Sequence, residues 1–171
     1  MSKVRRGPIT HVAVDYGLTL TSSADDVDPE LGMRPVSSAA QVVIRQLDAA
    51  GIILALVSNT LACQDRRPAL KAAGVDGLFC DRVYLSHEMA LNKASPRFYR
   101  RVLDDLGIGP CELVVCGNNI DTDVCVPAAL GIRAVLLGPI AVSTQLPPRT
   151  AVIRHIGDLP VLLTGEQITH A

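Results

Sequence analysis

Four short stretches of the chain carry the groups from which an anion-binding site could be built. Asp15 ends one apolar run, and Ser58 with Asn59 ends a second. Lys93 opens a predicted helix, and residues 117–119 (Gly-Asn-Asn) end a third apolar run. A hydroxyl, amides and an ammonium can together hold the oxygens of an anion, and a carboxylate beside them can attack it. Brought together, these groups would form a site with a nucleophile in it.

Taken singly, each of these residues has an ordinary structural explanation. An aspartate after a strand caps the following turn, and Ser-Asn at the same place forms a turn. Most lysines are solvated surface residues. Acids near a helix start, such as Asp121 and Asp123, complement the helix dipole. A shared site therefore depends on a fold that brings these separated ends together.

The hydrophobic pattern predicts the elements that would do so. Strands are expected where apolar, β-branched runs end in polar turns, and helices where Ser caps, an early Pro or a closing Gly mark the ends. The expected strands are 9–15, 52–60, 112–119 and 132–138, with one or two short strands in 77–86. The expected helices are 37–51, 65–75, 95–108 and 121–132, followed by a tail with a loop, a strand and a short helix.

This alternation predicts a doubly wound α/β fold, a Rossmann-like parallel sheet with helices on both faces. A chain of 171 residues with 49% hydrophobic side chains is expected to form one domain, with a core at about 9–138 and a C-terminal extension at 139–171. Ligands of such sheets bind outside the carboxyl ends of the strands. We therefore expect Asp15, Ser58 and residues 117–119 around one cleft.

Composition argues against several classes of protein. A net charge of -1, with basic clusters no longer than pairs such as Arg66-Arg67, gives no field for nucleic acid. The apolar runs are of strand length and no signal peptide precedes them, so a cytoplasmic protein without membrane association is expected. The five cysteines form no C-x-x-C pair and are expected to be reduced and mostly buried, Cys116 as a structural residue. The four histidines lie in no catalytic spacing.

The four polar stretches resemble, in this order, the four motifs of the haloacid dehalogenase-like (HAD) superfamily over most of the chain. VDYGLTLT resembles the first motif, with Asp15 at the nucleophile position, and LALVSNT the second, with Ser58 as the phosphate-binding hydroxyl. LNKASPRFYRRVLDDLGI resembles the third, with Lys93 as its cation. LVVCGNNIDTDVCVPAALGIRAVLL resembles the fourth, with Asp123 at the second acidic position.

The resemblance implies covalent catalysis by an aspartate. Asp15 would attack phosphorus, Ser58 would hold phosphoryl oxygens, and Lys93 would offset the developing charge. Thr19 and Asn59 belong to the same implied substrate-binding group. The resemblance also implies a magnesium ion, whose implied ligands are Asp15, the carbonyl of Gly17, Asn118 and Asp123.

The chain departs from the family pattern at three positions. Gly17 stands where the family has the acid that protonates the leaving group, and Leu18 where it has a glycine. Because a positioned general acid contributes about 10²- to 10⁴-fold in rate, its loss is expected to be severe for alkyl phosphates and milder for acyl phosphates. Asn118 replaces a carboxylate ligand, so magnesium binding is expected to be weakened unless Asn119 or Asp121 substitutes.

The spacing of the motifs leaves no room for a cap domain between Asp15 and Ser58 or between Ser58 and Lys93. An open site suits a small phosphorylated molecule, a macromolecular substrate, or a lid or missing acid supplied by a partner or a second copy in a homo-oligomer. We therefore predict a HAD-like hydrolase of the phosphohydrolase type with Asp15 as nucleophile. Two alternatives stand beside it: a catalytically silent HAD-fold binding or scaffold protein, and a metal-independent hydrolase that attacks carbon from Asp15.

Overall fold

The framework of the protein is a six-stranded sheet in which all neighbouring strands run parallel. The structure, a computed structural model, describes residues 8–141 and 143–168. The strands are β1 (His11–Val14), β2 (Ile53–Ser58), β3 (Val83–Leu85), β4 (Leu113–Gly117), β5 (Arg133–Leu137) and β6 (Thr150–Ile153). Their spatial order is β3-β2-β1-β4-β5-β6, so the chain winds outward in both directions from β1. This confirms the predicted doubly wound α/β fold.

Helices connect the strands, and their ends follow the predicted signals. Ser37 caps the first helix by accepting a hydrogen bond from the Ala40 N–H, and Ser95 caps the helix that begins at Pro96. The α-helices are α1 (Ser38–Ala49), α2 (Arg67–Ala72), α3 (Asp76–Phe79), α4 (Ser86–Met89), α5 (Pro96–Leu106), α6 (Val126–Ala129) and α7 (Leu159–Ile168). Shorter turns are the 3-10 helices η1 (Pro110–Glu112) and η3 (Ile156–Asp158) and the π-helix η2 (Ile120–Cys125).

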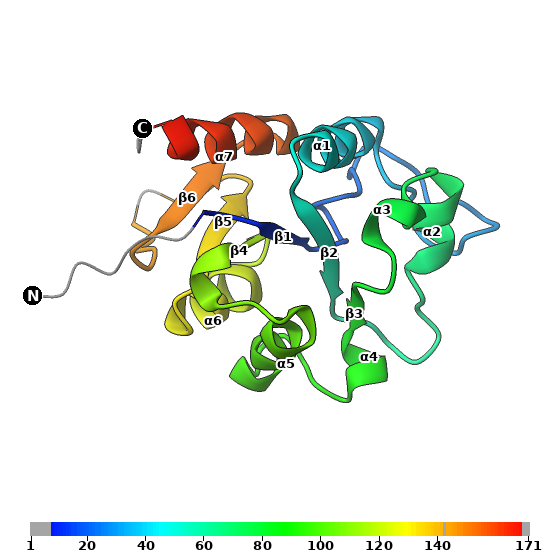
Figure 1. Cartoon of the computed structure of the whole chain (residues 1–171). Helices are drawn as coiled ribbons and strands as arrows, with labels where there is room; N and C mark the ends of the chain where they lie inside the picture. Colours follow the sequence, from blue (N-terminus) through cyan, green and yellow to red (C-terminus); the bar gives the residue numbers. More distant parts are fainter. Residues whose placement is uncertain (1–7, 142, 169–171) are drawn as a thin grey trace, which may run out of the picture.

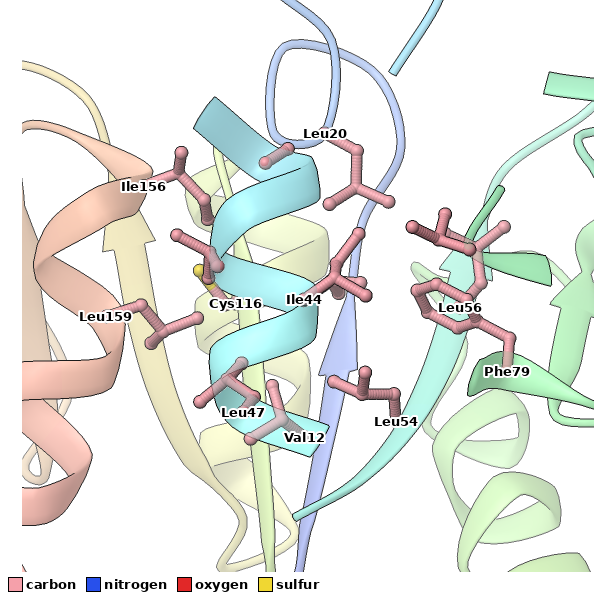
Figure 2. Close-up of a cluster of buried hydrophobic side chains, with 14 of the residues drawn as sticks. Val12, Leu20, Ile44, Leu47, Leu54, Leu56, Phe79, Cys116, Ile156 and Leu159 are labelled. Carbon is pink, nitrogen blue, oxygen red and sulfur yellow. The ribbon is translucent and has the colours of Figure 1, made fainter. Parts of the chain in front are cut away.

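The helices cover both faces of the sheet. In Figure 1, α1 and α7 lie on one face and α5 and α6 on the other. Ile44 and Leu47 of α1 pack over β1 and β2 together with Leu159 of α7 (Figure 2). On the opposite face, Phe98 and Tyr99 of α5 are fully buried. Since each buried apolar side chain of this size stabilises a fold by about 1.5–3 kcal/mol, the two layers hold the strand ends rigidly in place.

Three details differ from the sequence prediction. The region 77–86 contains the end of the helix α3 before its single strand, which agrees with the predicted one or two, and the helix expected at 121–132 begins as the π-turn η2. Lys93 lies in the turn before α5 and does not open the helix itself. The tail supplies the predicted strand and helix, β6 and α7, and Leu159 and Leu163 of α7 join the core.

The prediction that the cysteines are mostly buried is wrong. All five are free, but Cys63 and Cys80 are exposed, Cys111 and Cys125 are partly buried, and Cys116 alone among them is buried. Cys63 lies in the loop after β2 and Cys80 ends the short helix α3, so neither belongs to an apolar periodic run that would carry it inside. Cys116, in the middle of a central strand, has the predicted structural role.

No helix in the described part of the chain is both long and apolar enough to cross a bilayer. The segment between β1 and α1 consists of turns and a single antiparallel bridge between Asp28 and Met33. Because β1 lies between β2 and β4, the residues that follow these three strands meet at one edge of the sheet. The predicted juxtaposition of Asp15, Ser58 and residues 117–119 follows from this order.

Candidate active site

Asp15 follows the central strand β1 and stands in a tight loop. Its backbone N–H donates to the Cys116 carbonyl at 2.9 Å, which continues the pairing of β1 with β4 by one residue. The Tyr16 carbonyl then accepts the N–H groups of Thr19, Leu20 and Thr21 and so turns the chain sharply. The loop leaves the Asp15 side chain 12% exposed, which is enough for a carboxylate oxygen to reach a ligand.

Leu18 confirms how tight this loop is. Its φ of 56° lies in the left-handed region that favours glycine, and glycine is the residue that the resembled family has here. A side chain in this region carries a cost of about 1–2 kcal/mol. Leu18 therefore adopts a strained backbone conformation, and it is 49% exposed.

Lys93 lies between two carboxylates. Its Nζ is 2.7 Å from Asp15 Oδ1 and 2.6 Å from Asp123 Oδ1, and it donates more weakly to the Val57 carbonyl at 3.4 Å. Lys93 is 2% exposed and Asp123 only 1%, so the ammonium is effectively inside the protein. Two carboxylates and one ammonium give this cluster a formal charge of −1. The Lys93 ammonium therefore supplies the positive charge of this cluster.

The surroundings of Asp15 raise the pKa of its carboxyl above the ordinary value. Burial raises the pKa of the Asp15 carboxyl, Lys93 acts against this, and the negative charge of Asp123 raises it further. Oδ1 is held by Lys93, and Oδ2 has a long 3.5 Å contact from the Thr19 hydroxyl; the Tyr16 backbone N–H also stabilises the carboxylate. A desolvated carboxylate with one weakly bonded oxygen is a more reactive nucleophile than a solvated one.

This arrangement predicts the effect of Asp123→Asn on the pH profile. The substitution removes a charge that raises the pKa of Asp15 and leaves Lys93 to pair with Asp15 alone, so both effects lower that pKa. A nucleophilic Asp15 would act in its ionised form, so the acid limb of kcat/KM is expected to move to lower pH in the variant. A pH–rate profile of both proteins measures the shift, and a limb that moves to higher pH would contradict the assignment.

Asn59 positions the turn that carries Lys93. Its Oδ1 accepts the Lys93 backbone N–H at 2.9 Å, and its Nδ2 donates to Asn92 Oδ1 at 3.3 Å. Asn92 Oδ1 in turn accepts the Ala94 N–H at 2.8 Å, which closes the turn on itself. The contacts of the Asn59 carboxamide indicate that it positions Lys93; its predicted part in substrate binding stays a prediction.

The fourth motif delivers Asp123 to the site through the π-turn η2. Asp123 Oδ2 accepts the Asn119 N–H at 3.1 Å, and Asn119 Oδ1 caps η2 by accepting the N–H groups of Asp121 and Thr122. Gly117 is required beneath it, because a Cβ at this position would overlap the Asp123 carboxylate. Asn119 and Asp121 are exposed at the start of η2, where the Asn119 side chain is engaged as its cap.

Ser58 and Thr19 flank Asp15, and both are 2% exposed. The Thr19 hydroxyl donates a long hydrogen bond to Asp15 Oδ2. Within the described residues, Ser58 Oγ makes only long contacts of 3.4 Å with Arg66 Nε and 3.5 Å with the Asn59 carbonyl. Its hydroxyl therefore remains free to bond a ligand. Arg66 was not singled out by sequence, because nothing in its spacing separates it from its neighbour Arg67.

The residues implied as magnesium ligands do not fit a tight magnesium site. Asp15 Oδ1 accepts a hydrogen bond from Lys93, and Asp123 Oδ2 accepts the Asn119 N–H. Asp123 Oδ1 lies 2.6 Å from Lys93 Nζ as an ion pair but has no hydrogen-bond partner in the described residues. The remaining donors are Asp15 Oδ2, the Gly17 carbonyl and the neutral, partly buried Asn118. In residues 8–141 and 143–168, no three Asp, Glu, His or Cys side chains are grouped to hold a metal ion.

Position 17 carries no group that could move a proton, but it has space for one. Gly17 is exposed, its φ is not positive, and a Cβ built on it would meet nothing within 4 Å. An aspartate is therefore compatible with the local backbone. The absence of the general acid is a property of the sequence and is not imposed by crowding in the loop.

A family model matches more than half of the chain. The family model described as haloacid dehalogenase-like hydrolase matches residues 14–131, which span Asp15, Ser58, Lys93 and Asp123.

Solved structures share the fold at low sequence identity. An uncharacterized protein from Listeria monocytogenes serotype 4b is 23% identical, with a TM-score of 0.75 over 92% of this chain and 99% of that one. A haloacid dehalogenase-like family hydrolase from Xanthomonas campestris is 15% identical, with a TM-score of 0.71 over 95% and 97%. The putative HAD-hydrolase YfnB from Bacillus subtilis, solved bound to magnesium, is 11% identical, with a TM-score of 0.72 over 92% and 99%. From the matched region and the fold together, the chain belongs to the haloacid dehalogenase-like hydrolases.

Proposed function

We propose that the chain hydrolyses a small phosphorylated compound whose leaving group departs without a proton, as in an acyl phosphate, and that Asp15 is the nucleophile. One observation carries the proposal: Asp15 is buried, fixed through Oδ1 by Lys93, and left with a weakly bonded Oδ2, while position 17 offers no acid. A site with an oriented nucleophile and no proton donor selects substrates that need none.

The reaction has two balanced steps. Asp15 Oδ2 attacks phosphorus, and the bond between phosphorus and the leaving oxygen breaks with its electron pair, so a carboxylate is released unprotonated. A water molecule then attacks the phosphorus of the aspartyl phosphate, the bond to Asp15 breaks, and the proton of the water passes to solvent. Orthophosphate leaves and the Asp15 carboxylate is restored. Lys93 offsets the negative charge that gathers at phosphorus in both steps.

The lack of a general acid limits which leaving groups a substrate can have. Positioned general acid catalysis is worth about 10²- to 10⁴-fold, which corresponds to about 3–5 kcal/mol of activation free energy. An alkoxide cannot leave easily without this help, whereas the carboxylate of an acyl phosphate can. Alkyl phosphates are therefore expected to be poor substrates of the wild-type protein.

We infer further that turnover does not require magnesium. The donor set around Asp15 is poor for a hard divalent cation, and Lys93 Nζ already lies within 2.7 Å of both carboxylates. The expected result is phosphate release from an acyl phosphate that persists in the presence of a chelator.

The absence of an acid at position 17 and the poor set of metal ligands also favour a second candidate, attack by Asp15 at carbon. A halide leaves without protonation, and no phosphate then needs neutralising, so neither an acid at position 17 nor a metal is required. Halide release from a short 2-haloacid, measured beside phosphate release, separates the two candidates.

The test is a panel of acyl, aryl and alkyl phosphates assayed with the wild type, Asp15→Asn and Gly17→Asp, with and without magnesium. Wild type is expected to release phosphate from acyl phosphates only. Gly17→Asp is expected to extend activity to aryl and alkyl phosphates by about 10²-fold or more, because the new side chain has room and restores a proton donor.

Two results would contradict the proposal. Equal activity of wild type on alkyl and acyl phosphates would mean that a proton donor acts from elsewhere. Silence of both wild type and Gly17→Asp across the panel would remove support for phosphate chemistry and favour the binding or scaffold alternative.

A further inference from the structure

Arg66 lies beside the anion-binding hydroxyl of the site. It follows β2 in the loop that leads to α2, and its Nε donates to Ser58 Oγ at 3.4 Å. The carbonyl of Val57, the residue before Ser58, receives the long contact from Lys93 Nζ. Two cationic side chains therefore flank the end of β2, one buried and one partly exposed.

The charge of Arg66 is not neutralised by a carboxylate in the described part of the chain. Its neighbour Arg67 pairs with Asp65 at 3.1 Å and with Glu88 at 2.7 Å. Asp65 directly precedes Arg66 in the chain, yet the Arg66 side chain turns the other way, toward Ser58. Its partners there are a hydroxyl and the thioether of Met33, the latter at 3.7 Å.

Arg66 is held in this position before any ligand arrives. Its guanidinium carbon lies 4.7 Å from the centroid of the Tyr16 ring, a cation–π distance. The Tyr16 hydroxyl donates to the Arg34 carbonyl at 2.6 Å, which fixes the ring against the segment between β1 and α1. Burial raises the pKa of Tyr16 to about 12, and Arg66 acts in the opposite direction, so the ring stays neutral.

The hydrogen-bonding capacity of Arg66 is largely unused by the protein. A guanidinium has five N–H donors in a planar fork that matches the oxygens of a phosphoryl group. Nε and Nη1 make the two long contacts above, and Nη2 has no protein partner within residues 8–141 and 143–168. A fixed, charged and under-bonded guanidinium next to a free serine hydroxyl is suited to anion binding.

We propose that Arg66 binds the phosphoryl oxygens of the substrate together with Ser58, and so supplies the second positive charge of a site that lacks a magnesium donor set. This rests on the proposed function and deepens it. The Asp15, Asp123 and Lys93 cluster has a formal charge of −1, and Arg66 brings the charge facing a phosphoryl group to neutrality. The doubly negative phosphoryl group of the substrate then meets a site without net negative charge.

The test uses inorganic phosphate as the probe and its dissociation constant as the readout, so that it does not depend on turnover. Titration calorimetry of the full chain is done for wild type, Arg66→Gln, Arg66→Lys and Arg67→Gln. Arg66→Gln is expected to weaken phosphate binding by about 10- to 100-fold, the effect of losing a charge-assisted contact. Arg66→Lys keeps the charge without the fork and is expected to fall between wild type and Arg66→Gln.

Arg67→Gln is the matched control, because it removes one positive charge from the adjacent residue without touching Ser58. Unchanged phosphate affinity in Arg66→Gln, or an equal loss in Arg67→Gln, would overturn the assignment of Arg66 and leave the proposed function standing. Failure of the wild type to bind phosphate would overturn both. A thermal melt of each variant separates a lost contact from lost folding.

Discussion

Asp15→Asn is expected to reduce hydrolysis by about 10⁴-fold or more, because the amide oxygen cannot form the covalent intermediate. The substitution keeps the shape of the side chain, so binding geometry is retained. Rates of phosphate release under single-turnover conditions measure the loss. Activity within about 10-fold of wild type would exclude a nucleophilic role for Asp15.

The same substitution is expected not to destabilise the protein. Burial and Asp123 raise the pKa of Asp15, so the folded state favours its protonated form, and this contribution to stability is lost as pH rises through the folded pKa. At neutral pH the charge of Asp15 therefore opposes folding, and a neutral isostere removes that opposition. Lys93 keeps its ion pair with Asp123. We expect a melting temperature equal to or above that of wild type, and a clear fall would contradict the electrostatic account.

Lys93→Met is expected to have the largest effect on stability. The methionine fills most of the space but leaves Asp15 and Asp123 buried without their cation. Removing one partner of a buried ion pair costs about 3–5 kcal/mol, a large part of the stability of a domain of this size. Catalysis should be lost as well, since the charge at phosphorus is no longer offset.

The loss in Lys93→Met should depend on pH in a defined direction. Lys93 lowers the pKa of Asp15, so its removal raises that pKa further, and protonation of the carboxyl at lower pH relieves the buried charge. Urea unfolding at about pH 5 should thus show a smaller deficit than at about pH 7.5.

Two further variants complete the test of Lys93. Lys71→Met, at an exposed lysine of α2, is the control and is expected to change stability little. Adding Asp15→Asn and Asp123→Asn to Lys93→Met should recover much of the loss, because the unpaired charges are gone. A loss that is equal for Lys71 and Lys93, or unaffected by the added substitutions, would contradict the role assigned to Lys93.

The fold and the gathering of the site could be predicted because both follow from periodicity and topology. Apolar runs ending in Asp15, in Ser58 and in residues 117–119 were assigned correctly as strands, and parallel winding requires their carboxyl ends to share an edge. The order of the motifs also placed Lys93 near Asp15, although Lys93 proved to precede its helix.

What could not be predicted depends on side-chain direction. The sequence contains neighbouring arginines, and only the structure shows that Arg67 turns to Glu88 while Arg66 turns to Tyr16 and Ser58. Likewise, an Asn after a strand is equally compatible with binding a ligand and with holding a turn, and the hydrogen bonds of Asn59 favour the second. Local packing decides the direction of each of these side chains, and it leaves no periodic pattern in the sequence.

The most direct test of the central claim is the detection of a phosphoryl group on Asp15. The wild-type protein is mixed with acetyl phosphate, quenched in acid during turnover, and digested for peptide mass spectrometry, with Asp15→Asn treated in parallel. We expect a phosphorylated peptide whose modified residue is Asp15, absent from the variant. Release of phosphate by the wild type without any phosphoryl group on Asp15, or equal release by Asp15→Asn, would contradict it.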